Sequence, residues 1–487
     1  MRRSLRTALA ITAATAAATL AVPLAASGTA AAAPGASGAP AAPVPPRTPL
    51  TDFNHDGYAD LAISAPYATL GGKTNAGYVT VVYGSKDGPD HARPTVIDRG
   101  TAGVPGEITQ DGNFGSQVSV GDLDGDGFSD LAVGSGYGDE LLVLWGSRDG
   151  LSGAGAAELP ATSAGFSTGD FNGDGHRDLV SHDFPENEDD RAGMTVSYGP
   201  FTRGGKPERQ EAVYTGQTFG PIDLIPGDVT GDGVDDLVTS HGFEESAYPS
   251  RVWKGTKDGL SQDTKKLKSS LGGAIADVDG DGYGDFVTRD NGSNNDDNES
   301  DKGTVCVDYG SKDGPGAGRT AKITQDTAGV PGVGETGDQF GADISAGDVN
   351  GDGYADVAVG VPNEDIGSGS AKVADAGAFV LLKGARAGLS GAGAQAFDQS
   401  KPGVPGASEA KDWFGHRVLL SDVDGDKKAD LTVAAHGEDG TYKDSGAAWV
   451  FPGARGGLTT TGVVSFGPKG LGAPERNATF GQDVGRH

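Results

Sequence analysis

Cysteine is almost absent from the 487-residue sequence, which contains only Cys306. One cysteine cannot form a disulfide within the chain, so the loops must be held by something else. Basic residues are also scarce, because 38 lysines and arginines stand against 68 aspartates and glutamates, for a formal net charge of −30. This acidic balance excludes nucleic acid and anionic membranes as expected partners.

Long apolar runs are confined to the N-terminus. Residues 1–32 place Arg2, Arg3 and Arg6 before a weakly apolar run that ends in small residues, the pattern of a secretory signal peptide. Residues 33–48 form a Pro/Ala/Gly-rich linker. No later run reaches membrane-spanning length, so we expect a secreted, extracellular product without a membrane span. Removal of the signal takes away three basic and no acidic residues, which leaves a charge of about −33.

Glycine and aspartate are abundant instead. The chain has 83 glycines, and a nine-residue acidic motif recurs seven times at intervals of 48 to 74 residues. Positions 1, 3, 5 and 9 of this motif carry oxygen-bearing side chains, which is how a tight loop surrounds a hard cation such as Ca²⁺. The candidate metal ligands are Asp52, Asn54, Asp56 and Asp60; Asp122, Asp124, Asp126 and Asp130; Asp170, Asn172, Asp174 and Asp178; Asp228, Thr230, Asp232 and Asp236; Asp277, Asp279, Asp281 and Asp285; Asp348, Asn350, Asp352 and Asp356; and Asp422, Asp424, Asp426 and Asp430.

These acidic loops predict up to seven calcium ions, with the carbonyl of position 7 and water completing each shell. Position 6 is glycine in six loops and Lys427 in the seventh, which we therefore expect to be the weakest site. An EF-hand is excluded because its position 12 would be glutamate, whereas Ile63 and Val133 stand there inside predicted strands.

Short β-branched runs follow every acidic loop, and a further strand and a turn such as YGSKDG at 83–88 come next. Four strands per unit, repeated seven times, predict an all-β fold: a seven-bladed β-propeller of four-stranded blades over residues 49–487. The last segment, FGQDVGRH from Phe480, repeats the beginning of a unit. We expect this C-terminal strand to complete the first blade and close the ring.

Phe-Gly pairs precede several acidic loops and, together with the loops, resemble the FG-GAP repeat family. The pairs begin at Phe114, Phe219, Phe340, Phe414 and Phe480, and GAP-like segments occupy 64–66 and 360–362. The family is known from the N-terminal β-propeller of integrin alpha chains and from secreted bacterial relatives, so the resemblance implies a propeller with calcium loops. Gly165-Phe166 and Gly272-Gly273 depart from the pattern, which leaves the strand boundaries there less defined.

Alternating strand directions place the acidic loops on one face of the expected ring and the variable connections on the other. Variable loops on a rigid scaffold commonly carry recognition. We therefore expect a monomeric, secreted, calcium-binding recognition or adhesion module, with an unidentified protein or carbohydrate ligand on the face opposite the calcium loops. The alternative is an extracellular hydrolase or lyase, since related repeats accompany phospholipase and polysaccharide-degrading activities. The variable loops could equally be solvated insertions.

No catalytic residue is predicted. His182, His241 and His436 follow predicted strands on the variable face and are expected to be exposed, without a nucleophile beside them. Ser167 in GFSTG matches a serine-hydrolase pattern, but an acidic loop rather than a helix follows it. Cys306 is expected to be a buried strand residue.

Overall fold

The computed structural model describes residues 51–136, 140–162, 165–183, 193–216, 220–243, 246–290, 292, 301–316 and 318–486, with Phe243 described by its backbone alone. The predicted signal peptide and linker lie outside these residues, as does Phe219. One structural unit extends from Pro43 to His487. Among the described residues, no helix is long and apolar enough to cross a membrane.

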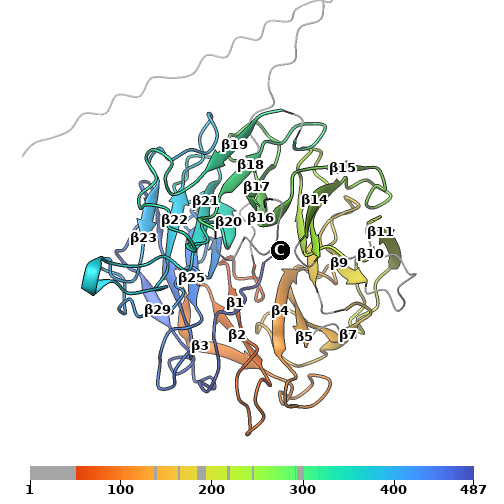
Figure 1. Ribbon diagram of the computed structural model, residues 1–487. Coiled ribbons are helices and arrows are strands. Elements are labelled where there is room, and N and C mark those ends of the chain that lie inside the picture. Colours follow the sequence, from red (N-terminus) through yellow and green to blue (C-terminus); the bar gives the residue numbers. More distant parts are fainter. Residues whose placement is uncertain are drawn as a thin grey trace, which may run out of the picture. The chain divides into compact units, whose positions relative to one another are not determined.

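Seven antiparallel sheets surround a common centre and form a seven-bladed β-propeller (Figure 1), which confirms the predicted fold. Blades one to three contain β1 (Leu61–Ala65), β2 (Tyr78–Tyr83) and β3 (Asp90–Ile97); β4 (Phe114–Gly121), β5 (Asp130–Ser135), β6 (Glu140–Leu144) and β7 (Ala157–Leu159); and β8 (Phe166–Gly169), β9 (Asp178–Asp183), β10 (Gly193–Tyr198) and β11 (Arg209–Tyr214).

Blades four to seven follow the same order. They contain β12 (Asp223–Gly227), β13 (Asp236–Phe243), β14 (Ser246–Trp253) and β15 (Thr264–Lys266); β16 (Ser270–Ala276), β17 (Asp285–Asp290), β18 (Val305–Asp308) and β19 (Thr320–Ile323); β20 (Ile344–Gly347), β21 (Asp356–Val361), β22 (Ala378–Leu382) and β23 (Gln395–Phe397); and β24 (Arg417–Ser421), β25 (Asp430–Ala435), β26 (Ala447–Phe451) and β29 (Val464–Phe466). A small hairpin of β27 (Gly453–Ala454) and β28 (Gly457–Leu458) and one 3-10 turn, η2 (Gly369–Ala371), complete the described elements.

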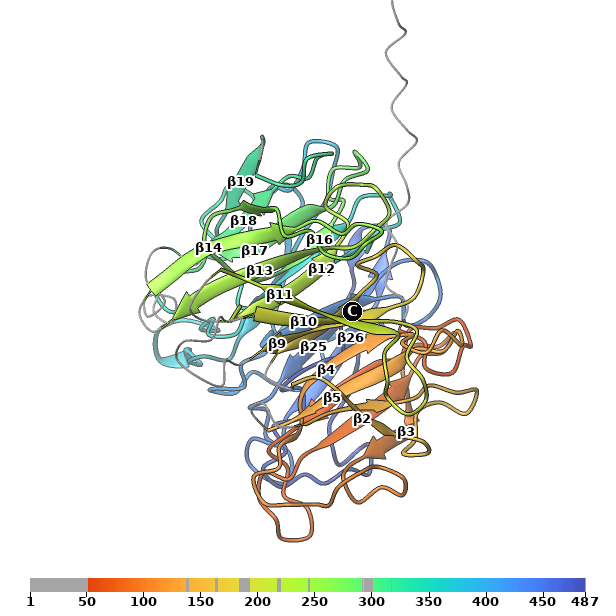
Figure 2. The ribbon, with the colours of Figure 1, turned by 90° about the vertical axis from the view of Figure 1, so that its right-hand side faces the viewer.

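Strand direction separates the two faces of the ring. In blades two to seven the acidic loop joins the first and second strands, and in blade one it leads into β1. The turn between the third and fourth strands lies on the same face, which we call the acidic face. The connections from second to third strand and from blade to blade lie on the opposite face. Figure 2 shows the sheets from the side, with their strands crossing between the two faces. This division was predicted from the repeat.

The hydrophobic core consists of seven clusters, each formed between two neighbouring blades. The second strands are buried along all or nearly all of their described length, as in the LAISA run of β1 and the DLAVGS run of β5. Both faces of such a strand pack against neighbouring sheets, so a continuous apolar run replaces the alternation of a half-exposed strand. Every blade therefore depends on both of its neighbours for burial.

The Phe-Gly pairs mark a close backbone contact between blades. Gly377, at the start of a third strand, has φ +87° and lies where an added Cβ would come within 2.3 Å of the Phe414 carbonyl oxygen. The Phe414 N–H donates to the Ala376 carbonyl at 3.0 Å. The same approach occurs at Gly77, Gly303 and Gly446, against Phe114, Phe340 and Phe480. Glycine is required there because a side chain would collide with the neighbouring backbone.

Two first strands depart from this pattern, as their sequences indicate. In blade three, β8 begins at Phe166, after a Gly165 whose carbonyl accepts the His182 N–H at 2.9 Å. In blade five, Gly272 and Gly273 lie within β16, where the pairing with β17 shifts between Leu271 and Ala274. These glycines thus accommodate a β-bulge.

The C-terminal segment completes blade one and closes the ring, as predicted. Gly481 N donates to Ser64 O at 2.9 Å, Ser64 N to Asp483 O at 3.0 Å, and Gly485 N to Ala62 O at 2.8 Å. Arg486 then reaches across the centre of the ring, where its guanidinium contacts Asp343 and its Nη2 donates to Val418 O at 3.0 Å.

A central cavity of about 1120 Å³ runs along the first strands. The tail residues Asp483, Val484 and Arg486 contribute to its lining. The Arg486 carbonyl also accepts the Val120 N–H at 2.7 Å, so the tail joins blades one, two, six and seven.

Candidate metal centres

The aspartate at position 9 of each acidic loop is a buried side chain that accepts backbone hydrogen bonds on both of its oxygens. In blade two, Asp130 is fully buried, and its Oδ2 and Oδ1 accept from Leu123 N and Gly146 N, both at 2.8 Å. The same pair of bonds, at 2.8 to 3.2 Å, recurs for Asp60, Asp130, Asp178, Asp236, Asp285, Asp356 and Asp430. This carboxylate ties the acidic loop to the turn between the third and fourth strands.

Sequence reasoning assigned position 9 only a ligand role and missed this structural one. The available signal was a glycine that follows each third strand, as Gly146 follows β6. Its N–H is the second donor to the carboxylate in every blade.

We expect Asp130→Ala to lower the free energy of unfolding by about 3–5 kcal/mol in chelator, because two buried N–H groups lose their acceptor. Urea unfolding measures this loss. The matched control is Asp126→Ala in the same loop, whose side chain is exposed and should change stability by less than about 1 kcal/mol. Equal losses in the two variants would contradict the structural role.

The aspartate at position 1 organises the loop around its own carboxylate. Asp122 Oδ1 accepts from Gly125 N at 2.8 Å and from Asp126 N at 3.1 Å, while Oδ2 accepts from Gly127 N at 2.9 Å. At position 5, Asp126 Oδ1 accepts from Phe128 N at 3.1 Å. These hydrogen bonds to the loop's own carboxylates curl the chain, as in Asx-type turns.

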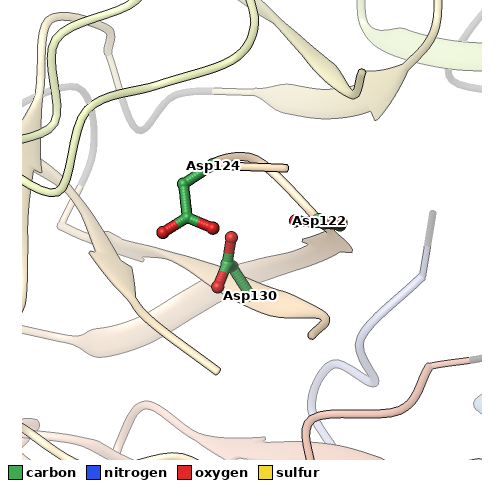
Figure 3. Close-up of side chains that lie close together, drawn as sticks. All are labelled: Asp122, Asp124 and Asp130. Atoms are coloured by element: carbon green, nitrogen blue, oxygen red, sulfur yellow. The ribbon is translucent and has the colours of Figure 1, made fainter. Parts of the chain in front are cut away.

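Three loops bring carboxylates from positions 1, 3 and 9 together, with one oxygen of each within 4.8 Å of the others. These triads are Asp122, Asp124 and Asp130; Asp277, Asp279 and Asp285; and Asp422, Asp424 and Asp430. Figure 3 shows the carboxylates of Asp124 and Asp130 pointing toward each other. The position-5 aspartates do not belong to the triads. In the other four loops position 3 is Asn54, Asn172, Thr230 or Asn350, so a triad of carboxylates cannot form from these positions.

The chemistry of the triads fits a hard cation. Asp279 Oδ1 and Asp422 Oδ1 are buried and have no hydrogen-bond partner in the described part of the chain. The pKa of Asp130 is raised to about 8 and that of Asp285 to about 7, chiefly by burial and also by the neighbouring carboxylates, while backbone amides oppose the shift. Oxygen donors that repel one another in a poorly solvated place are stabilised by a divalent ion.

Arginines already compensate part of the charge in two loops. The Arg203 guanidinium contacts the carboxylates of Asp124 and Asp126 and lies 5.3 Å from the centre of the Trp145 ring. In blade five, Arg319 Nη1 lies 3.0 Å from Asp279 Oδ2. A cation entering these triads competes with the guanidinium for the same oxygens.

Lys427 holds the conformation that glycine has in the other six loops. Its φ is +69°, against +86° to +92° at the six glycines, and its N–H donates to Asp422 Oδ2 at 2.9 Å. The loop thus keeps its shape, but a left-handed conformation of a residue with a Cβ costs about 1–2 kcal/mol.

We expect Lys427→Gly to raise the free energy of unfolding by about 1 kcal/mol in chelator and to tighten calcium binding to this loop, because strain and a positive charge are both removed. Urea unfolding and calorimetric titration measure the two effects. The control is Arg455→Gly, which removes an exposed charge from the acidic face of the same blade without relieving a positive φ. No gain over this control would show that Lys427 is neither strained nor repulsive.

Neighbouring acidic loops are hydrogen bonded to one another around the ring. The residue at position 8 donates its N–H to the position-1 carbonyl of the preceding loop, as from Ser129 to Asp52 at 2.9 Å, and Ala59 to Asp422 at 3.0 Å joins blade one to blade seven. The same bond reaches the carbonyls of Asp170, Asp228, Asp277 and Asp348. Between blades three and four an ion pair adds to the contact, since Arg177 Nη1 donates to Asp235 Oδ2 at 2.7 Å. A change in one loop therefore acts directly on its neighbour.

The histidines on the opposite face are not exposed, so that expectation was wrong. His182 is 6% exposed and His241 is 1% exposed. His436 is half-buried and stacks on the Trp413 ring, with the ring centres 4.8 Å apart. They lie at the ends of second strands, and His436 packs against residues of its own blade. Burial lowers the pKa of His182 and of His241 to about 4; Asp223 opposes the shift at His182, and Arg251 adds to it at His241.

A neutral buried histidine makes the fold sensitive to acid. We expect stability to be full above pH 6.5 and to fall as the pH drops toward 4, by up to about 3 kcal/mol for each of His182 and His241, because only the unfolded chain takes up these protons readily. Denaturant unfolding between pH 4 and 7 measures the slope. It should flatten in the His182→Gln/His241→Gln variant and not in His91→Gln, whose side chain is exposed. Identical slopes would contradict the prediction.

Two further residues singled out by sequence lie in strands. Ser167 is buried in β8, which leads into the acidic loop beginning at Asp170, so the strand-to-helix turn of a hydrolase nucleophile is not present there. Cys306 in β18 is half-buried rather than buried, with its Sγ 3.8 Å from Asp290 Oδ2. Burial raises the pKa of this thiol to about 11, which disfavours the reactive thiolate.

Comparison with known proteins identifies the repeat. The FG-GAP repeat model matches residues 47–82, 114–157, 340–382 and 414–451, which fall in blades one, two, six and seven. Phosphatidylinositol-glycan-specific phospholipase D of Mus musculus is 33% identical over 144 residues, covering 26% of this chain and 17% of that protein. Integrin alpha pat-2 of Caenorhabditis briggsae is 40% identical over 100 residues, which are 19% of this chain and 7% of that protein. Integrin alpha-5 of Xenopus laevis is 37% identical over 98 residues, which are 20% of this chain and 9% of that protein.

The chain spans less than a fifth of the length of these relatives. Among solved structures, a chain of the crystal structure of BBS1N in complex with ARL6DN aligns with 86% of this chain at 11% identity and a TM-score of 0.35, a likeness too weak to bear on fold or function. The matched repeats, the Phe-Gly contacts between blades and the closed ring agree with one another. The chain thus carries FG-GAP repeats and forms an integrin alpha-like β-propeller.

Proposed function

We propose that this protein is a secreted, calcium-stabilised recognition or adhesion module that binds a protein or carbohydrate ligand with the face opposite the acidic loops. The observation that carries the proposal is the placement of exposed apolar side chains. The large hydrophobic residues that stay exposed in the described part of the chain are Tyr67, Tyr214, Ile222, Val333 and Tyr442, at 37% to 67% exposure. All five lie on connections of the opposite face or at strand ends that reach it.

Exposed aromatic and aliphatic groups on polar loops are typical of binding surfaces. The acidic face has no such groups among the described residues, and its seven loops are joined to one another by backbone hydrogen bonds. In this arrangement the acidic face is the scaffold and the variable connections of the opposite face are the recognition loops, as is common in proteins that bind ligands through loops.

Calcium in the seven acidic loops is part of this proposal. The ions would be held by the aspartates of positions 1 and 9 and by the side-chain oxygen of position 3, which belongs to aspartate, asparagine or threonine. The carboxylate of position 5 would reach the ion directly or through water. Their bound charge would relieve the repulsion among carboxylates and stabilise the ring, which has no disulfide. The integrin and phospholipase D relatives support a module of this kind by their repeats alone, because this chain covers only a small part of each.

The test is a binding screen on arrays of glycans and cell-envelope polymers, with calcium and with chelator. Tyr214→Ser/Val333→Ser/Tyr442→Ser alters the opposite face, and Lys86→Ser/Lys257→Ser/Lys312→Ser is the matched control on the acidic face, where these lysines are 73% to 85% exposed. We expect binding at least tenfold weaker in the first variant and unchanged in the second. A loss confined to the lysine variant would place recognition on the acidic face and refute the proposal.

A further inference from the structure

Three connections between blades on the opposite face share one sequence pattern but differ in charge. Each carries a Gly-Val-Pro-Gly segment, at 103–106, 329–332 and 403–406. Five residues before the valine stand Arg99, Gln325 and Gln399, respectively. Two residues before the Phe-Gly pair that follows stand Gly112, Asp338 and Asp412. Thus the connection with an arginine lacks the aspartate, and the two connections with a glutamine have it.

In the first connection, the arginine supplies a buried positive charge. The Arg99 side chain is 8% exposed, and its Nη2 donates to Glu140 Oε2 at 2.7 Å and to Ser135 Oγ at 2.8 Å. Its Nη1 donates to the Pro105 carbonyl at 2.7 Å. The guanidinium is therefore surrounded by oxygen atoms.

In the other two connections, carboxylates gather where the guanidinium is lost. Gln399 Nε2 donates to Glu438 Oε2 at 2.7 Å, and Gln325 Nε2 donates to Glu364 Oε2 at the same distance. Asp412, which is 2% exposed, accepts the Glu409 N–H on its Oδ2 at 2.6 Å. Asp338, which is 3% exposed, accepts the corresponding Glu335 N–H.

The charge around these pairs is mostly negative. In the connection that leads to blade seven, Asp412 and Glu438 are repelled by the carboxylates of Glu409 and Asp439. In the connection that leads to blade six, Asp338 and Glu364 are repelled by the carboxylates of Glu335 and Asp365. Burial, followed by repulsion from these neighbours, raises the pKa of Glu438 and Glu364 to about 7. In the other connection Lys302 opposes the shift at Asp338, and Lys372 contacts Glu335 and Asp365 from the surface.

Each glutamine also leaves one buried oxygen without a partner. Gln399 is 2% exposed and Gln325 is 4% exposed, and the Oε1 of each has no hydrogen-bond partner among the described residues. Because the same carboxamide donates to the glutamate through its nitrogen, the unpaired oxygen lies close to that glutamate carboxylate. A buried acceptor left unpaired is unfavourable, and a cation coordinated by this oxygen would satisfy it.

We propose that each of these two connections binds one hard divalent cation of the calcium class, in the place that the Arg99 guanidinium occupies in the first connection. Glu438, Asp412 and the Oε1 atom of Gln399 are the donors near blade seven. Glu364, Asp338 and the Oε1 atom of Gln325 are the donors near blade six. These sites lie on the face opposite the acidic loops and are separate from them, so they would stiffen the loops of the proposed recognition surface.

The test counts calcium ions on the full chain by native mass spectrometry. We expect Glu364→Gln/Glu438→Gln to bind two ions fewer than the unchanged protein. The matched control is Glu140→Gln on the same face, which should lose none, because the Arg99 guanidinium already compensates Glu140. The difference of two is expected whether or not the seven acidic loops bind calcium, so it is independent of the calcium proposed there.

A second variant reproduces the arginine arrangement within the glutamine connection. Gln399→Arg with Asp412→Gly places a guanidinium beside Glu438, and we expect one ion fewer with a melting temperature in chelator no lower than that of the unchanged protein. This variant decides the question if the double glutamate variant does not fold. Unchanged ion counts in the folded variants would show that the carboxylates hold protons only, and would overturn the proposal.

Discussion

Deletion of residues 481–487 is expected to lower the free energy of unfolding by more than about 5 kcal/mol. The deletion removes the strand paired with β1, the buried Val484 side chain and the Arg486 contacts to blades two, six and seven. Loss of a buried aliphatic side chain and of several backbone hydrogen bonds accounts for this magnitude. Denaturant unfolding, followed by tryptophan fluorescence, measures it.

The deletion should also change how the ring unfolds. Each core cluster lies between two blades, so exposing the inner edge of blade one weakens its contacts with both neighbours. Arg486→Ala is the control, because it removes the contacts across the centre but leaves the strand pairing, and it should have a smaller effect. A deletion variant that unfolds at the same denaturant concentration as the full chain would show that blade one does not need the tail.

Chelation of calcium is expected to lower the melting temperature by about 9 °C or more. An ion present at a hundredfold excess over its dissociation constant stabilises the fold by about 2.7 kcal/mol, so the three carboxylate triads alone would supply about 8 kcal/mol. For roughly 440 folded residues, that free energy corresponds to about 9 °C. Scanning calorimetry of the same preparation with calcium and with chelator measures the shift.

A variant built from the protein's own repeats is the control for chelation. Asp124→Asn/Asp279→Asn/Asp424→Asn gives the three triads the asparagine that stands at position 3 in loops one, three and six. The folded loops should persist, since Asn54 and Asn172 accept the position-5 N–H as Asp124 does. We expect the effect of the chelator to shrink markedly in this variant. An equal melting temperature with and without chelator in the unchanged protein would exclude calcium as the staple of the ring.

The sequence alone determined the propeller, the number of blades, the closure by the C-terminal strand and the division into two faces. These features are local and repeated. A β-branched run follows each acidic loop, and Phe-Gly pairs recur in five of the units, so each copy supports the assignment of the others. Strand direction then fixes which connections share a face, and no knowledge of packing is needed for that step.

Only the tertiary structure decided what individual side chains do. The sequence predicts Asp130 only as one more ligand of the motif. In the structure its oxygens accept hydrogen bonds from the N–H groups of Leu123 and of Gly146, which lies 16 residues away. From the sequence, His182 and His241 were expected to be exposed loop residues, yet both lie within strands and are buried. The pairing of Gln399 with Glu438 joins residues 39 apart. Burial and pairing of this kind depend on which blades meet, and packing between blades is a property of the closed ring rather than of any single repeat.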